Sequence, residues 1–202
     1  MNDLTTKERI LSVAEKKFVS LGIANTQMKD IANELNINRR TLYRYFPTKD
    51  ELAFEIELIV MGRIQNYFGA LINEADFNTG FEKVKAYFEK VDIDGIKELM
   101  KFTGEFDRYF QNDYPNKEME KSFLEVLNPE NDPLYQYIAE GIADGSIRTD
   151  VSARELFHLI SHSFFALFQR LILRENHLNE EYCDDIDFKK VFKKVILSGL
   201  KK

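Results

Sequence analysis

The 202-residue chain has no tryptophan, one cysteine, four prolines and nine glycines. The single cysteine, Cys183, excludes an intramolecular disulfide and a cysteine-rich zinc site, and it suits a reducing cytoplasm. The scarcity of proline and glycine favours helices over a turn-rich β fold. The sequence has no glycine-rich phosphate loop and no evident Ser/His/Asp or Cys/His grouping. We therefore predict no catalytic site, no metal site and no cofactor.

Long apolar stretches are also missing. The first ten residues, MNDLTTKERI, lack the apolar segment of a signal peptide. The longest continuous apolar run, Phe164–Phe168, is too short to cross a bilayer. Hydrophobic residues still make up 44% of the chain, which is enough for a buried core. These features predict a soluble cytoplasmic protein that does not bind a membrane.

Charge is unevenly distributed along the chain. The net charge is −6, but residues 1–52 carry nine Lys/Arg against seven Asp/Glu, and the remainder carries nineteen against twenty-seven. A locally positive segment in an acidic protein is expected where the chain binds nucleic acid. The alternative is a solvated surface whose charge varies without function.

The first fifty residues show three short helices with clear start signals. Thr5 to Glu8 form a capping box that opens the first helix, and Gly22 is placed to end it with a left-handed C-cap. Thr26 is predicted to cap a second helix, and Asn38 to cap a third that runs from about Arg39 to Phe46. Asn36 lies in the turn between them, where asparagine tolerates a positive φ.

The third helix divides its side chains between core and surface. Leu42 and Phe46 are four residues apart and are predicted to face the core. The remaining positions carry cations, hydroxyls and a tyrosine that point outward: Arg39, Arg40, Thr41, Tyr43 and Arg44. The second and third predicted helices, joined by a tight turn, have the layout of a helix-turn-helix, in which the later helix carries the polar and cationic face.

This segment resembles the TetR family of bacterial transcriptional regulators. The resemblance rests on Ile31-Ala32, Thr41-Leu42-Tyr43, Tyr45-Phe46, Thr48-Lys49 and Leu52. It implies an all-α fold of about nine helices. A three-helix DNA-binding domain would span residues 1–48, and a helical effector-binding and dimerisation domain would span residues 49–202. The sequence departs from the family pattern at Asn36, Asn38 and Arg40, where Gly, Ser and a small residue are usual.

The resemblance also implies DNA contacts, residue by residue. Thr26 and Gln27 would contact phosphate at the start of the second helix, and Tyr43, Tyr45 and Lys49 would contact phosphate around the third. The leading residues of the third helix would read base edges. Two alternatives stay open: Tyr45 could be partly core, and Arg44 could face either way. The full set is Thr26, Gln27, Asn38, Arg39, Arg40, Thr41, Tyr43, Arg44, Tyr45 and Lys49.

The pattern remains helical to the end of the chain. Thr48 to Glu51 form a second capping box, which opens a long helix from Lys49 to about Asn73, and Ser152 to Glu155 form a third. Further helices are predicted near residues 80–91, 95–111, 117–127, 132–144, 153–175 and 187–200.

The last two predicted helices carry more apolar surface than one core face requires. The helix from about 153 to 175 is apolar around most of its circumference, which indicates burial on more than one side. We predict that these helices form a four-helix interface in a two-fold homodimer; the alternative is a fully buried monomer core. The predicted interface residues are Phe157, Ile160, Phe164, Phe168, Phe188, Phe192 and Val195.

The second domain would also hold an effector pocket, by resemblance. Aromatic residues with one or two carboxylates suit a flat or cationic apolar ligand; the alternative for each residue is an ordinary aromatic core. The candidates are Tyr67, Phe68, Tyr87, Phe88, Phe102, Glu105, Phe106, Tyr109 and Phe110. His158 and His162 have metal-ligand spacing, but in an apolar helix we interpret them as packed, neutral histidines.

Together these features predict a TetR-like homodimer that represses transcription from a palindromic double-stranded DNA operator until an unknown small-molecule effector binds. One alternative is a nucleoid- or partner-binding adaptor of the same fold without ligand switching. An enzyme built on a helix bundle is disfavoured.

Overall fold

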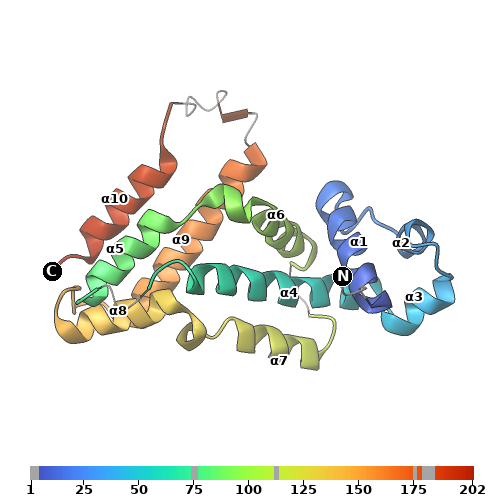
Figure 1. Ribbon diagram of the computed structural model, residues 1–202, viewed down its shortest axis with the longest axis horizontal. Coiled ribbons are helices and arrows are strands. Elements are labelled where there is room, and N and C mark those ends of the chain that lie inside the picture. The colour runs from blue at the N-terminus through green and yellow to red at the C-terminus, as the bar shows by residue number, and fades with distance from the viewer. Residues whose placement is uncertain (1–4, 74–76, 112–113, 175–176, 179–184) are drawn as a thin grey trace. The chain divides into compact units, whose positions relative to one another are not determined.

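The computed structural model describes residues 5–73, 77–111, 114–174, 177–178 and 185–202, so Cys183 lies outside the described residues. The all-α prediction is confirmed, with ten α-helices in the described part of the chain (Figure 1). They are α1 (Thr6–Leu21), α2 (Met28–Glu34), α3 (Arg39–Tyr45), α4 (Lys49–Gly69), α5 (Gly80–Lys90), α6 (Ile93–Tyr109), α7 (Lys117–Val126), α8 (Pro133–Asp144), α9 (Ala153–Arg174) and α10 (Phe188–Leu200), with a 3₁₀ turn, η2 (Pro129–Asn131).

The helices divide into two compact units. Unit 1 comprises residues Met1–Arg63 and Glu98–Val126, and unit 2 comprises Ile64–Lys97 and Leu127–Lys202. Helices α4 and α6 therefore each contribute one part to unit 1 and the other part to unit 2.

Helix starts follow the predicted capping chemistry at most positions. The Thr5–Glu8 capping box is complete, and Ser152 exchanges backbone and side-chain hydrogen bonds with Glu155 in the same way. Thr48 accepts a hydrogen bond from the Glu51 backbone N–H at 3.1 Å. Asn36 has the expected positive φ, at 52°.

The predicted capping role of Thr26 is wrong. Helix α2 begins at Met28, and its N-cap is Gln27, which makes no side-chain cap hydrogen bond. Thr26 is instead buried, and its hydroxyl donates to the Gly22 carbonyl oxygen at 2.8 Å. A buried hydroxyl group needs a hydrogen-bond partner. The partner here is a carbonyl oxygen of the preceding loop, and not a backbone N–H of α2.

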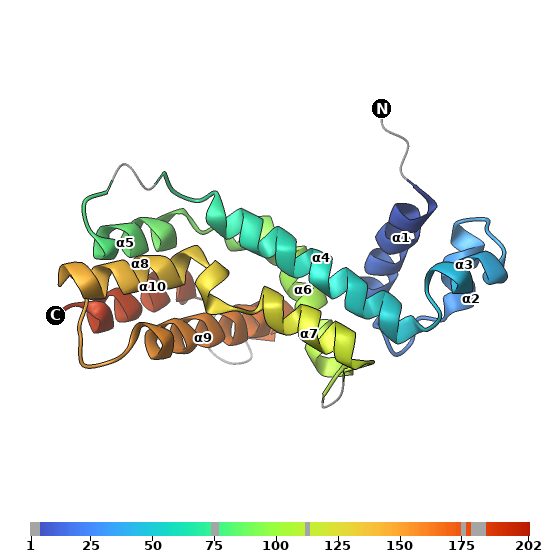
Figure 2. The ribbon, with the colours of Figure 1, turned by 90° about the horizontal axis from the view of Figure 1, so that it is seen from below.

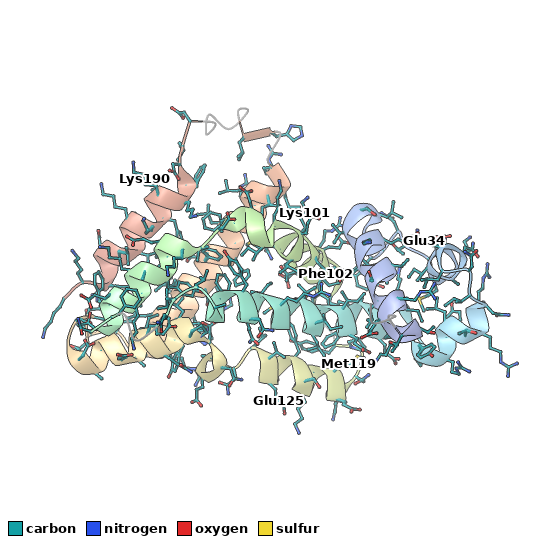
Figure 3. All side chains as sticks on the ribbon, in the orientation of Figure 1. Glu34, Lys101, Phe102, Met119, Glu125 and Lys190 are labelled. Carbon is teal, nitrogen blue, oxygen red and sulfur yellow. The ribbon has the colours of Figure 1, made fainter. Side chains whose placement is uncertain are left out.

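The core of unit 1 is built from the apolar stripes of the short N-terminal helices. On α1 the buried residues are Ile10, Ala14 and Phe18, and on α2 they are Met28, Ile31 and Ala32. Phe102 of α6, labelled in Figure 3, is fully buried. Its ring lies 6.4 Å from that of Phe18. The first three helices thus bury one face each and leave the other face to solvent.

Unit 2 is a bundle in which α5, α8, α9 and α10 lie side by side (Figures 1 and 2). Helices α5 and α8 approach closely where Gly80 of α5 meets Gly141 of α8, because neither residue has a Cβ. Phe192 of α10 packs on Phe164 and Phe168 of α9, with ring centroids 5.9 Å apart in both pairs. The lysines of α10, such as Lys190, lie at the surface (Figure 3).

Helix α9 is long and apolar enough, by length and composition alone, to cross a membrane, the one such helix among the described residues. One face of it is used inside unit 2, where Leu156, Phe157, Ile160, Phe164 and Phe168 are buried. Contacts with α8 and the rings of α10 cover this face. We therefore treat α9 as a core helix with additional exposed apolar side chains.

The Gly80–Gly141 contact generates a prediction about stability. A Cβ at position 80 would collide with backbone atoms of Gly141 and Tyr137, which cannot move without separating α5 from α8. Gly80→Ala should lower the free energy of unfolding by about 1–3 kcal/mol, the usual cost of overpacking. Gly62→Ala is the matched control, since position 62 lies within α4 and has no atom within 4 Å of the added Cβ. Urea unfolding followed by circular dichroism compares the two; equal midpoints would contradict the predicted collision.

Candidate nucleic-acid interface

Helix α3 presents a polar face to solvent. Asn38 caps it, accepting a hydrogen bond from the Arg40 backbone N–H at 2.8 Å. Leu42 and Phe46 are buried, as predicted. Tyr43 and Tyr45 are 46% and 37% exposed, so Tyr45 does not belong to the core.

The exposed face of α3 is positively charged. Arg39, Arg40 and Arg44 are exposed, and the helix contains no acidic residue. None of these three arginines forms an ion pair within the described part of the chain. Arg44 lies over the ring of its neighbour Tyr45, 5.5 Å from the centroid. The guanidinium groups are thus available to an anionic partner such as DNA.

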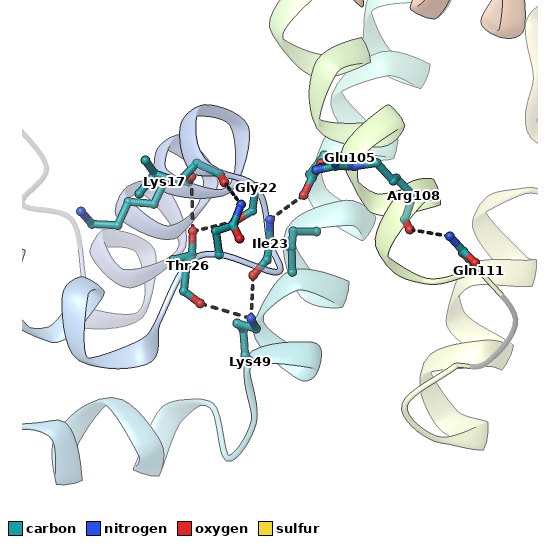
Figure 4. Close-up of polar contacts among 10 residues, drawn as sticks. Lys17, Gly22, Ile23, Thr26, Lys49, Glu105, Arg108 and Gln111 are labelled. Atoms are coloured by element: carbon teal, nitrogen blue, oxygen red, sulfur yellow. Dashed lines mark hydrogen bonds and ion pairs between the residues drawn. The ribbon is translucent and has the colours of Figure 1, made fainter.

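The loop between α1 and α2 is held by Lys49 at the start of α4 (Figure 4). The Lys49 ammonium donates to the carbonyl oxygens of Ile23 at 2.6 Å, Ala24 at 3.1 Å and Thr26 at 3.2 Å. It also lies 5.4 Å from the centroid of the Tyr109 ring. The side chain predicted to contact phosphate therefore fixes the backbone that leads into the helix-turn-helix.

Helix α6 holds the same loop from a second direction. Glu105 Oε1 accepts a hydrogen bond from the Ile23 backbone N–H at 2.6 Å, and Arg108 pairs with the same carboxylate (Figure 4). Tyr109 donates its hydroxyl to Asp50 at 2.8 Å. Burial, together with this hydrogen bond, raises the pKa of Tyr109 to about 12. Glu105 and Tyr109 were predicted to line an effector pocket. In the structure Glu105 hydrogen bonds to Ile23 of the loop, and Tyr109 hydrogen bonds to Asp50 of α4.

The remaining predicted DNA contacts divide by exposure. Gln27 is exposed at the start of α2, and Thr41 is partly exposed on α3. Thr26 is buried, and its hydroxyl hydrogen bonds only within the protein, to Gly22 and Lys17 carbonyls. Of the predicted set, Thr26, Asn38 and Lys49 have side-chain polar atoms that hydrogen bond within unit 1.

The predicted pocket aromatics belong to two different units. Tyr67, Phe68, Tyr87 and Phe88 are in unit 2, where Phe68 stacks on Tyr87 with centroids 5.4 Å apart. Phe102, Phe106 and Phe110 are in unit 1. The structure therefore does not show the nine predicted residues as one site.

A ring cluster in unit 1 centres on a residue that the sequence pattern did not single out, Phe54 of α4. Its ring is fully buried and meets four others edge to face, at centroid distances of 5.4 to 6.0 Å. We call this set the Phe54 cluster: Phe54, Phe106, Phe110, Tyr114 and Phe123. Of these five residues, only Phe106 and Phe110 were predicted pocket residues.

Glu57, one turn after Phe54 on α4, is the second residue that the pattern missed. It is 2% exposed, and its Oε2 atom has no hydrogen-bond partner in the structure. Burial, with a smaller effect from the Asp107 carboxylate, raises the pKa of Glu57 to about 8. Its carboxyl group is therefore mainly protonated and neutral at pH 7.

The predicted interface residues of α9 and α10 also divide by exposure. Phe157, Ile160, Phe164 and Phe168 are buried within the protomer, and Phe188 and Phe192 are partly exposed. Val195 is 63% exposed. The exposed apolar side chains of the two helices are Leu159, Leu173, Val191 and Val195.

The two histidines of α9 stack on each other, with ring centroids 5.7 Å apart and planes 17° from parallel. Glu155, one turn earlier, uses its carboxylate to cap Ser152. Among the described residues, no group of three or more His, Cys, Asp or Glu side chains could hold a metal ion.

Comparisons with known proteins agree with this geometry. Residues 10–56 match the profile of bacterial regulatory proteins of the tetR family. The HTH-type transcriptional repressor KstR2 of Mycolicibacterium smegmatis is 23% identical over 163 residues, which cover 76% of this chain and 73% of that protein.

Solved structures share the fold over nearly the whole chain. A TetR family transcriptional regulator from Vibrio parahaemolyticus superposes with a TM-score of 0.70 at 20% identity, covering 98% of this chain and all of the other. The transcriptional regulator FadR from Bacillus subtilis, solved in complex with stearoyl-CoA, gives 0.65 at 18% identity and covers 95% of this chain and 98% of the other.

The exposed arginines of α3, its Asn38 cap and the matched profile define a helix-turn-helix DNA-binding protein. More particularly, residues 10–56 match the tetR family, and the chain is similar over most of its length to TetR-family transcriptional regulators.

The buried carboxyl group of Glu57 predicts a pH-dependent stability. Its pKa is higher in the folded protein than in the unfolded chain, so the unfolded chain releases a proton that the folded protein keeps. The free energy of unfolding should therefore fall as pH rises from about 4.5 to about 8, by up to about 1.4 kcal/mol per pH unit from this group. Glu57→Gln should remove that fall.

Urea unfolding at pH 5.5, 6.5 and 7.5 measures the effect. The stability advantage of the Glu57→Gln variant over the wild type should grow with pH. Glu55→Gln is the control on the same helix, because Glu55 lies near the surface and pairs with Lys7 at 2.6 Å. Parallel pH profiles for wild type and Glu57→Gln would refute the prediction.

Proposed function

We propose that this regulator represses transcription by binding a palindromic operator as a homodimer and that a small-molecule effector releases it. Residues 1–48 would form the DNA-binding domain, and residues 49–202 would carry the effector and dimer functions. The observation that carries the proposal is the set of exposed arginines on α3, which have no ion-pair partner among the described residues. Such a helix suits the major groove, where arginine can bond the two acceptors of guanine.

The clamp on the α1–α2 loop supports an effector response. The Ile23 backbone carries hydrogen bonds from both sides: its carbonyl oxygen accepts from Lys49 of α4, and its N–H donates to Glu105 of α6. A shift of α6 would alter the second bond and so the placement of α2 and α3. To weaken operator binding ~100-fold, the effector must favour the released state by ~2.7 kcal/mol.

The exposed apolar face of α9 and α10 supports the dimer. Leu159 and Leu173 on α9 and Val191 and Val195 on α10 are between 51% and 69% exposed. Apolar groups left in water on two neighbouring helices favour a self-complementary helical interface. The second function considered, an adaptor without ligand switching, has no specific observation in its favour.

Operator binding provides the first test of this function. Arg40→Ala should reduce discrimination between operator and mutated operator by about 1–3 kcal/mol if Arg40 reads a base. If Arg40 contacts phosphate, binding should weaken equally on all sequences and the salt dependence should become shallower. Fluorescence anisotropy with DNA flanking the protein's own gene, at several salt concentrations, measures both. Arg154→Ala, an exposed arginine on α9, is the control. Unchanged binding by Arg40→Ala would remove it from the interface.

Oligomeric state provides the second test. Val195→Glu places a carboxylate on the exposed apolar face of α10 and should convert the dimer to monomer at micromolar concentration, since burying an unpaired charge is costly. Lys194→Glu introduces the same group at the exposed neighbouring position and should leave the dimer intact. Sedimentation or light scattering gives the masses. A monomeric wild type would contradict the dimer, and a dimeric Val195→Glu variant would contradict this face.

A further inference from the structure

Glu57 is a glutamate buried in the core, where this residue type is rarely found without a partner. It is 2% exposed, and one carboxyl oxygen has no hydrogen-bond partner. Burying a polar atom without a partner costs free energy that a leucine or methionine in the same place would avoid. A group kept at such a cost is a candidate for binding a ligand.

Glu57 lies on α4, and the acidic group that acts on it, Asp107, lies on α6. In α4 and in the part of α6 that belongs to unit 1, each cation has a partner elsewhere. Lys49 binds the loop carbonyls, Arg63 pairs with Glu15, Lys101 with Glu98 and Arg108 with Glu105. The charge acting on Glu57 comes instead from Asp107 of α6, an exposed carboxylate of the same sign. These four cations therefore do not neutralise Glu57.

Rings of the Phe54 cluster lie on the same two helices as Glu57 and Asp107. Phe54 and Glu57 are three residues apart on α4 and therefore share a helix face. Phe106 precedes Asp107 on α6, and its ring lies 5.4 Å from that of Phe54. Ring faces attract a cation electrostatically, most strongly where water is excluded. A carboxylate and aromatic ring faces are the groups that attract an organic cation.

The cluster extends from the core to the surface. Phe54 is fully buried, Phe106 is 3% exposed and Tyr114 is 40% exposed. Phe123 belongs to α7, a helix with no buried residue, and Leu124 beside it is 54% exposed. Few apolar contacts hold α7 down, so it can move at low cost and admit a ligand to the rings.

We propose that the effector of this regulator is an organic cation with an apolar or aromatic body, bound by the Phe54 cluster with Glu57 as its counter-ion. This inference rests on the proposed effector response and names the chemical class of the effector. The stearoyl-CoA seen with FadR of Bacillus subtilis is an anion, and Glu57 would supply no positive charge to it. Because Glu57 is protonated before binding, each cation bound would displace one proton.

Two ions of the same shape and opposite charge test the chemical class. Isothermal titration calorimetry of the purified full chain would use tetraphenylphosphonium, tetraphenylborate and the smaller cation benzyltrimethylammonium. We expect at least one cation to bind and the borate anion not to bind. The affinity for the cation should rise about tenfold per pH unit between pH 6 and 8, because binding displaces a proton.

Variants assign the binding to this site. Glu57→Gln keeps the shape of the side chain and should weaken cation binding at pH 8 at least tenfold, and it should abolish the pH dependence. Phe123→Leu, on the weakly held helix α7, should weaken binding without changing the pH dependence. Glu55→Gln, on the same helix as Glu57 but paired with Lys7, should bind as the wild type does.

The outcomes separate this inference from the proposed function. Failure of both cations to bind, equal binding of the two tetraphenyl ions, or unchanged binding by Glu57→Gln would overturn it. Operator release is measured separately, by anisotropy. If stearoyl-CoA released the operator and neither cation bound, the switch would stand and the cation site would fall. If a cation bound through Glu57 and left operator binding unchanged, the site would stand and the switch would fall.

Discussion

The fixed α1–α2 loop is the constraint on which the DNA-binding part of the molecule depends. Helix α2 has seven residues and no side-chain cap, so its start is set by the loop before it. Gly22 opens the loop with φ at 86°, and a Cβ there would lie 2.9 Å from the Glu105 carboxylate. Lys49 and Glu105 then satisfy the loop's backbone groups. Two short helices that are marginal alone are thereby held in one arrangement.

Most of the fold could be predicted from local sequence signals. The capping box at Thr5, the Asn38 cap and the positive φ of Asn36 depend on residues within a few positions of each other, and helical periodicity gave the later helices to within a few residues. The clamp could not be predicted in this way. The Ile23–Glu105 bond joins residues 82 positions apart, and the Lys49–Ile23 bond joins residues 26 apart. A lysine at a helix start looks like a phosphate contact until its partners are known.

The contacts between aromatic rings were even harder to predict from the sequence. With seventeen phenylalanines and nine tyrosines in the chain, spacing alone cannot say which rings meet. Phe106 and Phe110 were among the predicted pocket residues, but their ring partner Phe54 was not. Glu57 lies between Ile56 and Leu58 in the sequence, and its burial follows only from how α4 packs within unit 1. Burial of a charge is a tertiary property, so the sequence pattern gives no sign of it.

Helix α3 has one further consequence, for how this protein can evolve. Leu42 is its only buried residue, so six of its seven side chains contribute little to the core. Substitutions at those positions cost little folding free energy, because exposed side chains away from caps and the core are usually near neutral. Target-sequence preference can therefore drift while the scaffold stays intact. After a gene duplication, two copies could acquire separate sets of target promoters through changes in a single turn or two of helix.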